Sequence, residues 1–191
     1  MNKRRFFFLI LIGIVSGIGY AIISQSYPIA LVNWQSIAMK DFKTNYSSAR
    51  LYYRRALEIY NKEQAGVLDL SETQKEFSRA VLDKLIEDIL IEQELKKRFK
   101  NNELEKMVAE KIERAFKGKD IRKEAETFYG LSFEKFKENF LEPQAKSEIF
   151  ASRLLLENKD FNEELKKIKK QAAVTILSPN FQWNGEGVII N

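Results

Sequence analysis

Two closely spaced pairs of acidic residues are the side chains whose type would suit general acid–base chemistry: Glu87 with Asp88, and Glu124 with Glu126. A catalytic pair of this kind needs two carboxylates whose surroundings push their pKa values apart. Both pairs lie in lysine-rich stretches with a helical pattern, which is typical of a solvated helix face. We therefore expect no acid–base site at either pair.

Histidine and cysteine are both missing from the 191 residues. Their absence excludes histidine-based triads, thiol nucleophiles, metal sites with imidazole or thiolate ligands, and disulfides. The glycine-containing stretch "GIVSGIG" (residues 13–19) lies inside an apolar run and lacks the strand and helix that a phosphate-binding loop requires. The sequence thus predicts a protein that is not an enzyme and that has no metal or cofactor.

Aromatic side chains are the remaining candidates for recognition, because they offer large apolar contact areas. Trp34 precedes a helical pattern, and Tyr52 and Tyr60 point to faces of that helix away from its apolar stripe. The aromatic residues expected in the core recur at helical spacing: Phe42, Tyr46 and Tyr53. We predict that Trp34, Tyr52 and Tyr60 contact an apolar partner; the alternative is that they are ordinary surface or packing residues.

The N-terminus combines a basic cluster, within residues 1–5, with an uncharged run over residues 6–23. As a helix, this run would be about 27 Å long, close to the thickness of the hydrocarbon core of a bilayer. Signal peptides usually have a shorter apolar core and a small-x-small cleavage site, which residues 24–26 match poorly. We favour an uncleaved transmembrane signal-anchor, with the N-terminus cytoplasmic and the remainder extracytoplasmic; secretion after signal cleavage is the alternative.

The net charge of +5 is concentrated at this N-terminus. Lys3, Arg4 and Arg5 are three of the 32 basic residues, so the rest of the chain carries 29 basic and 27 acidic residues. Nucleic-acid binding requires a clustered basic face, which such a balanced segment does not indicate. We therefore expect the partners to be proteins and the membrane, and not nucleic acid.

Beyond the apolar run, the pattern predicts helices between two strand-like ends. Pro28 and residues 29–33 favour a short strand, and residues 172–177 favour another before Pro179. Apolar spacing and capping residues indicate about six helices between them. The first two run from 37 to 61 and from 71 to 98, and the second begins with an S-x-x-Q capping box at residues 71–74. The third begins at a cap at Asn102, and the fourth runs from 120 to 129 with Gly130 as its C-cap. The fifth begins at Ser132 and is kinked or broken at Pro143, and the sixth runs from Asn158 to 170.

The two predicted strands have no partner beside them in this pattern. Because an isolated strand leaves its backbone donors and acceptors unmet, we expect residues 29–33 to pair with residues 174–177. This pairing would close the two ends of the domain on each other.

Three stretches, together with the final strand-like segment, have motifs in common with one known protein family. Residues 32–42, "VNWQSIAMKDF", are similar to the V-N-G-E-x-I-x-x-x-x-F opening of that family. Residues 81–98 resemble its L-x-x-L-I-x-x-x-L-L-x-x-x-A-K-K helix, and residues 129–150 its G-L-S-x-x-E-F/L-R helix. The final "AVTIL" (173–177) is similar to its returning strand. Over residues 29–178 the chain therefore resembles the N-terminal chaperone domain of the SurA, PrsA and PpiD group of folding factors.

The resemblance implies a mainly α SurA N-terminal-like domain over residues 24–178, with its terminal β-strands paired and a tail over residues 179–191. Trp34 stands where the family has glycine, and Gln35 where it has glutamate. If that glycine has a positive φ, we expect the turn to be shaped differently here. The parvulin prolyl isomerase domain of many family members is missing, since the chain passes directly from residue 156 to the last helix.

Two functions fit the sequence. The first is a membrane-anchored extracytoplasmic chaperone, a holdase for unfolded or newly translocated proteins without isomerase activity. The second is a non-catalytic scaffold or interaction module with one specific partner, such as a translocon or envelope-assembly component. Promiscuous suppression of aggregation favours the first, and a single stoichiometric partner favours the second.

Overall fold

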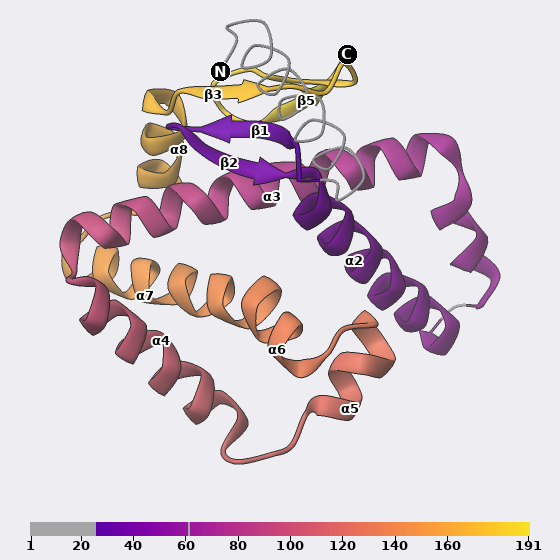
Figure 1. Ribbon diagram of the computed structural model, residues 1–191, viewed down its shortest axis with the longest axis horizontal. Helices are drawn as coiled ribbons and strands as arrows, with labels where there is room; N and C mark the ends of the chain where they lie inside the picture. Colours follow the sequence, from indigo (N-terminus) through magenta and orange to yellow (C-terminus); the bar gives the residue numbers. More distant parts are fainter. Residues whose placement is uncertain (1–25, 61) are drawn as a thin grey trace, which may run out of the picture.

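The computed structural model describes residues 26–60 and 62–191, so the predicted cytoplasmic segment and transmembrane anchor or signal lie outside the described residues. Within the described part, no helix is both long and apolar enough to cross a bilayer. The described chain is mainly helical with a few short antiparallel strands, as predicted (Figure 1).

Helix α3 is the longest described helix and lies between the strands on one side and α2, α7 and α4 on the other (Figure 1). In chain order the helical segments are α2 (Met39–Tyr60), the 3-10 segment η1 (Lys62–Asp69), α3 (Ser71–Arg98), α4 (Asn101–Phe116), α5 (Arg122–Glu124), the π-helical turn η2 (Ala125–Tyr129), α6 (Phe133–Phe136), the π-helical turn η3 (Lys137–Leu141), α7 (Glu142–Leu156) and α8 (Phe161–Gln171).

The predicted pairing of the terminal strands is confirmed. Strand β1 (Pro28–Val32) lies antiparallel to β3 (Val174–Ile176), with Ala30 opposite Ile176. The prediction that β1 has no local partner is wrong, because β1 also pairs with β2 (Gln35–Ala38) in a hairpin. Residues 37 and 38 were assigned to the first helix because one buried apolar residue, Ile37, suits a helix and a strand equally.

Asn33 ties this hairpin to the far end of the domain. Its backbone N–H donates to the carbonyl of Ala173 (2.9 Å), and its Oδ1 accepts from the Ala173 N–H (2.9 Å). Its Nδ2 also donates to Oε1 of Gln93 on α3 (2.8 Å). One side chain therefore joins the hairpin turn, α3 and the segment that leads into β3.

The turn of the hairpin consists of Asn33 and Trp34, whose φ angles are 48° and 70°. Two consecutive positive φ angles are typical of the type I′ turn, which matches the twist of the two strands. Trp34 thus adopts the left-handed conformation itself, and a difference in turn shape from the family stays a prediction. A left-handed non-glycine residue costs about 1–2 kcal/mol.

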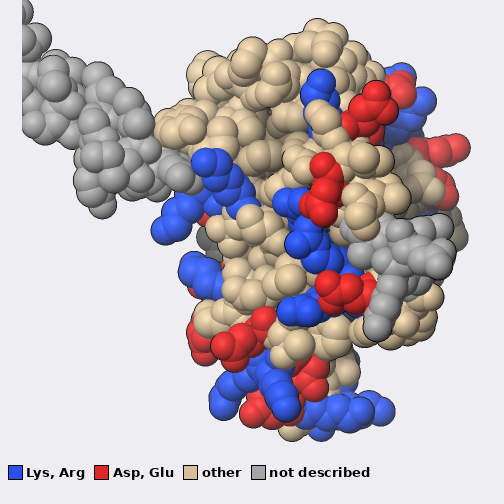
Figure 2. Space-filling view, turned by 90° about the vertical axis from the view of Figure 1, so that its right-hand side faces the viewer, with Lys and Arg blue, Asp and Glu red and all other residues tan. Residues whose placement is uncertain are grey.

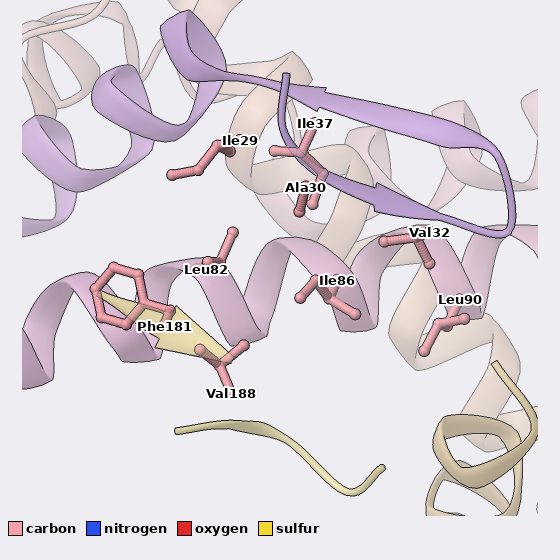
Figure 3. Packing of buried hydrophobic residues seen from close by; sticks show 9 residues of the cluster. All are labelled: Ile29, Ala30, Val32, Ile37, Leu82, Ile86, Leu90, Phe181 and Val188. Atoms are coloured by element: carbon pink, nitrogen blue, oxygen red, sulfur yellow. The ribbon is translucent and has the colours of Figure 1, made fainter. Parts of the chain in front are cut away.

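The core beneath the sheet is formed by β1, β2, α3 and two segments from the C-terminus (Figure 3). The side chains of Leu82, Ile86 and Leu90 on α3 lie against those of Ile29, Ala30, Val32 and Ile37. The next turns of α3 bury Ile91 and Leu95 against α4, α7 and α8 in a second cluster. Helix α3 therefore serves both clusters, because its apolar residues occupy two faces.

Residues 179–191, expected to be a tail, belong to the folded domain. They form an antiparallel hairpin of β4 (Phe181–Trp183) and β5 (Val188–Ile190), and both Phe181 and Val188 are buried in the core (Figure 3). Asp83 on α3 accepts a hydrogen bond from the Val188 N–H (3.0 Å). The short strands carry too few residues for a clear alternating pattern, so their burial was missed.

The predicted bounds of α3, from 71 to 98, are confirmed, but the predicted side-chain caps at Ser71 and Asn102 are wrong. Helix α3 begins at Ser71 itself, after the extended Leu70, and no side-chain cap forms; Gln74 donates instead to the carbonyl of Asp69 (3.0 Å). Helix α4 begins one residue before Asn102, again without a side-chain cap. A capping box requires the polar residue to sit just outside the helix, and the apolar pattern does not fix that position to one residue.

The last helix begins after Asp160, not at Asn158. Asp160 is extended and its Oδ1 accepts from the Glu163 N–H (2.9 Å), while Asn158 has a φ of 54° in the turn before it. The caps at Ser132 and Gly130 are confirmed. An irregularity near Pro143 is also confirmed, since the π-helical turn η3 directly precedes α7; proline lacks the N–H that a regular helix would need there.

Candidate functional site: an aromatic cleft between three helices

A cavity of about 460 Å³ lies between α2, α3 and the segment from η2 to α7; we call it the aromatic cleft. Ligand sites typically have volumes of about 300–1,000 Å³ and mostly apolar walls with a few polar groups. The lining combines aromatic and aliphatic side chains with amides and one pair of charged groups. The aromatic members are Tyr53, Phe77, Tyr129, Phe136 and Phe140.

Aromatic rings form a continuous series of contacts from α2 to η3, with centroids 4.5–6.3 Å apart. Such pairs contribute about 0.5–1.5 kcal/mol beyond the area they bury. The series runs through Phe42, Tyr46, Phe77, Tyr53, Tyr52, Tyr129, Phe136 and Phe140. Burial and the neighbouring Tyr52 and Tyr53 raise the pKa of Tyr129, so its phenol stays neutral.

Gly130 gives this wall its shape. It ends η2 with a φ of 66°, and its N–H donates to the carbonyl of Glu126 (3.0 Å). A Cβ at this position would lie 3.1 Å from Cδ2 of Leu51 on α2. Glycine therefore allows the chain to reverse close to α2, which brings Tyr129 against the α2 tyrosines.

Amide side chains join the two walls across the cleft. Asn45 on α2 is buried, and its Nδ2 donates to the Asp41 carbonyl (3.0 Å) and to Oδ1 of Asn139 on η3 (3.2 Å). Asn139 in turn donates to the carbonyl of Lys135 (2.8 Å). Since both hydrogens of the Asn45 amide are used, its carbonyl oxygen remains as an acceptor beside the cleft.

The charged members of the lining are Lys84 and Asp88, one turn apart on α3 and joined by an ion pair. The Asp88 side chain is 15% exposed and that of Lys84 57%. Burial raises the pKa of Asp88 above its ordinary value, although Lys84 acts in the opposite direction. The expectation of a solvated face is therefore wrong for Asp88, because α2 and α7 cover that side of α3.

A second hollow, of about 610 Å³, lies between α4 and α7. Its basic side chains are all paired with carboxylates, for example Lys111 with Glu148 (2.8 Å) and Arg153 with Glu157 (3.0 Å). Phe99 is the single aromatic residue of its lining, so it lacks the ring cluster of the aromatic cleft. We therefore take the aromatic cleft as the better candidate site, although it is smaller.

The three sequence-predicted site residues do not lie together. Trp34, at the hairpin turn, and Tyr60, at the end of α2, are 92% and 87% exposed, and neither lines the cleft. Tyr52 is 40% exposed and stacks on Tyr129, whose ring does line it. Tyr52 is thus beside the cleft, and the other two are not part of its lining.

Tyr53, Phe77 and Tyr129 were missed as site residues. Tyr53 was placed in the core by its helical spacing, but it is 51% exposed and opens onto the cleft. The covered face of α2 instead buries the polar residues Asn45 and Ser48. The aromatic run around residues 129–140 was the available signal.

In the part of the chain that the structure describes, no cluster of three or more acidic side chains is placed to hold a metal ion. On the face shown in Figure 2, basic and acidic side chains alternate, with no broad surface of one sign. Comparison of the chain with protein-family models, curated proteins and solved structures found no match.

Proposed function

We propose that this protein is a membrane-anchored extracytoplasmic holdase, a chaperone that binds unfolded or newly translocated proteins without isomerising their prolines. Residues 6–23 are the anchor, and the aromatic cleft is the client-binding surface. No cofactor or metal takes part in this activity.

The aromatic cleft is the observation that carries the proposal. Holdases need apolar surface that remains accessible in the folded protein, and contiguous apolar surface of this kind marks interaction sites. Here Tyr53 is half exposed while it lines a cavity with Phe77, Tyr129 and Phe140. The rings tolerate many client sequences, because every apolar side chain finds contact area there.

The resemblance of residues 29–178 to the SurA, PrsA and PpiD chaperone domain supports the same proposal. The absence of histidine and of a parvulin-like segment supports the non-enzymatic part of it. The paired terminal strands and the helical body agree with the architecture that the resemblance implies.

The test combines two assays on the full chain in lipid nanodiscs. We expect the chain to slow the aggregation of chemically unfolded clients in proportion to its concentration. Proline cis–trans relaxation of a peptide should keep its uncatalysed time of tens of seconds or longer. Tyr53→Ser should weaken the protection, whereas Tyr60→Ser, on the same helix but outside the cleft, should retain it.

Measured acceleration of prolyl isomerisation would refute the non-enzymatic part. Failure to bind any unfolded client, together with stoichiometric capture of one folded partner, would replace the holdase by the scaffold alternative.

A further inference from the structure

Asp88 is a carboxylate without a fixed buried partner. Its ion-pair partner Lys84 lies on the same helix and is mostly in solvent, so Lys84 can leave at little cost. The other basic group near Asp88 is Lys146 on α7, which is bonded to Glu92 (2.8 Å). The adjacent Glu87 is engaged by Lys169 and adds negative potential.

The surroundings of Asp88 favour a cation over an anion. The rest of the cleft lining is uncharged, with Tyr53, Phe77, Tyr129, Phe136 and Phe140 on its walls. Aromatic faces attract ammonium and guanidinium groups, and a carboxylate with little exposure to water strengthens that attraction. The raised pKa of Asp88 indicates that Lys84 does not fully offset the burial of this carboxylate.

We propose that the aromatic cleft selects client segments that carry an arginine or lysine among aromatic or aliphatic residues, with Asp88 binding the basic group and Lys84 moving aside. This inference rests on the proposed function, because it names the segments that the same cleft binds. Lys84 occupies the position of the client's cation when the cleft is free.

The selection follows from exchange of one ion pair for another. The client's basic group replaces Lys84 at Asp88, and the released Lys84 is hydrated in solvent. The client's cation also lies against the aromatic faces of the cleft and away from water, whereas Lys84 is mostly in solvent. A neutral residue at the same place in the client would leave the Asp88–Lys84 pair intact and gain only the apolar contacts.

The test uses two fluorescent peptides of identical aromatic-rich sequence, one with a central arginine and the other with citrulline, which has nearly the same shape and no charge. Their affinities for the full chain in lipid nanodiscs are measured by fluorescence anisotropy. We expect the arginine peptide to bind about fivefold more tightly, the scale of one cation–aromatic contact, because the ion pair at Asp88 is exchanged and not added.

Two variants locate the effect. Asp88→Asn should abolish the arginine preference while the citrulline peptide binds as before, and Lys84→Met should increase the preference because the competing cation is gone. Glu76→Gln is the matched control: it removes the same charge from α3 at an exposed position outside the cleft lining, and the preference should persist.

Equal affinities of the two peptides for the unmodified chain, or a preference that survives Asp88→Asn, would overturn the inference and leave the proposed function intact. If neither peptide bound although unfolded clients were still protected, the inference would likewise be wrong. If clients were not protected either, the proposed function would fail with it.

Discussion

The ring of Tyr52 on α2 stacks on the ring of Tyr129 at the end of η2, with centroids 5.0 Å apart and planes inclined by 20°. This contact joins two segments that meet because Gly130 reverses the chain beside α2. We therefore expect Tyr52→Ser to lower the free energy of unfolding by about 1 kcal/mol.

Tyr60→Ser is the control for this change, since Tyr60 is almost fully exposed on the same helix. Urea denaturation should show no measurable loss of stability for Tyr60→Ser. Equal losses in the two variants would mean that the stacking contributes nothing.

The two hydrogen bonds between Asn33 and Ala173 predict that replacing Asn33 destabilises the protein more than replacing Asn158. Asn33 and Asn158 both have positive φ, but Asn33 alone of the two has side-chain hydrogen bonds in the described structure. Alanine tolerates the left-handed conformation less well than asparagine, so both alanine variants lose some stability for this reason. Asn33→Ala should in addition lose bonds worth about 1–2 kcal/mol, which thermal denaturation of both variants will measure. Equal melting temperatures would contradict this role of Asn33.

Replacement of Trp34 by glycine should stabilise the protein. Glycine adopts the φ of 70° without steric cost, and the Trp34 side chain is too exposed to lose packing. The gain is about 1 kcal/mol at most, because glycine also increases the entropy of the unfolded chain. A lower melting temperature of Trp34→Gly would show that the indole makes a stabilising contact.

Asp88 predicts a pH dependence with a definite sign. Its pKa in the folded protein is raised by burial, so the folded state binds this proton more tightly than the unfolded state. The free energy of unfolding therefore falls as pH rises from the pKa of Asp88 in the unfolded chain to its higher pKa in the folded protein. The loss persists at neutral pH. Asp88→Asn should gain stability relative to the unmodified chain between about pH 3 and about pH 7.

Urea denaturation of both proteins at the two pH values gives this difference directly. A difference in unfolding free energy that is constant, or that moves against Asp88→Asn as pH rises, would contradict the raised pKa.

The pairing of β1 with β3 was predictable because residues 29–33 and 174–177 both have clear β character, although the premise that β1 lacks a local partner was wrong. The helix α3 was predictable because its apolar residues recur over several turns. The hairpin at residues 179–191 was not, since strands of three residues carry no periodic signal.

The aromatic cleft could not be predicted from the sequence, for a different reason. Helical spacing shows which residues share a face of one helix, but not which face another helix covers. It thus placed Tyr53 in the core and Asp88 in solvent, whereas the structure places both in the cleft lining. The reversal at Gly130 and the π-helical turns η2 and η3 decide this arrangement, and they follow from contacts between distant segments.

The central claim is that the aromatic cleft binds unfolded clients, and site-specific photocrosslinking tests it most directly. A photoreactive phenylalanine derivative replaces Tyr53, which is exposed and lines the cleft, or Tyr60, which is exposed on the same helix outside it. Each full-length variant is irradiated with a permanently unfolded polypeptide. We predict strong crosslinking from position 53 and little from position 60; equal or stronger crosslinking from position 60 would contradict the account.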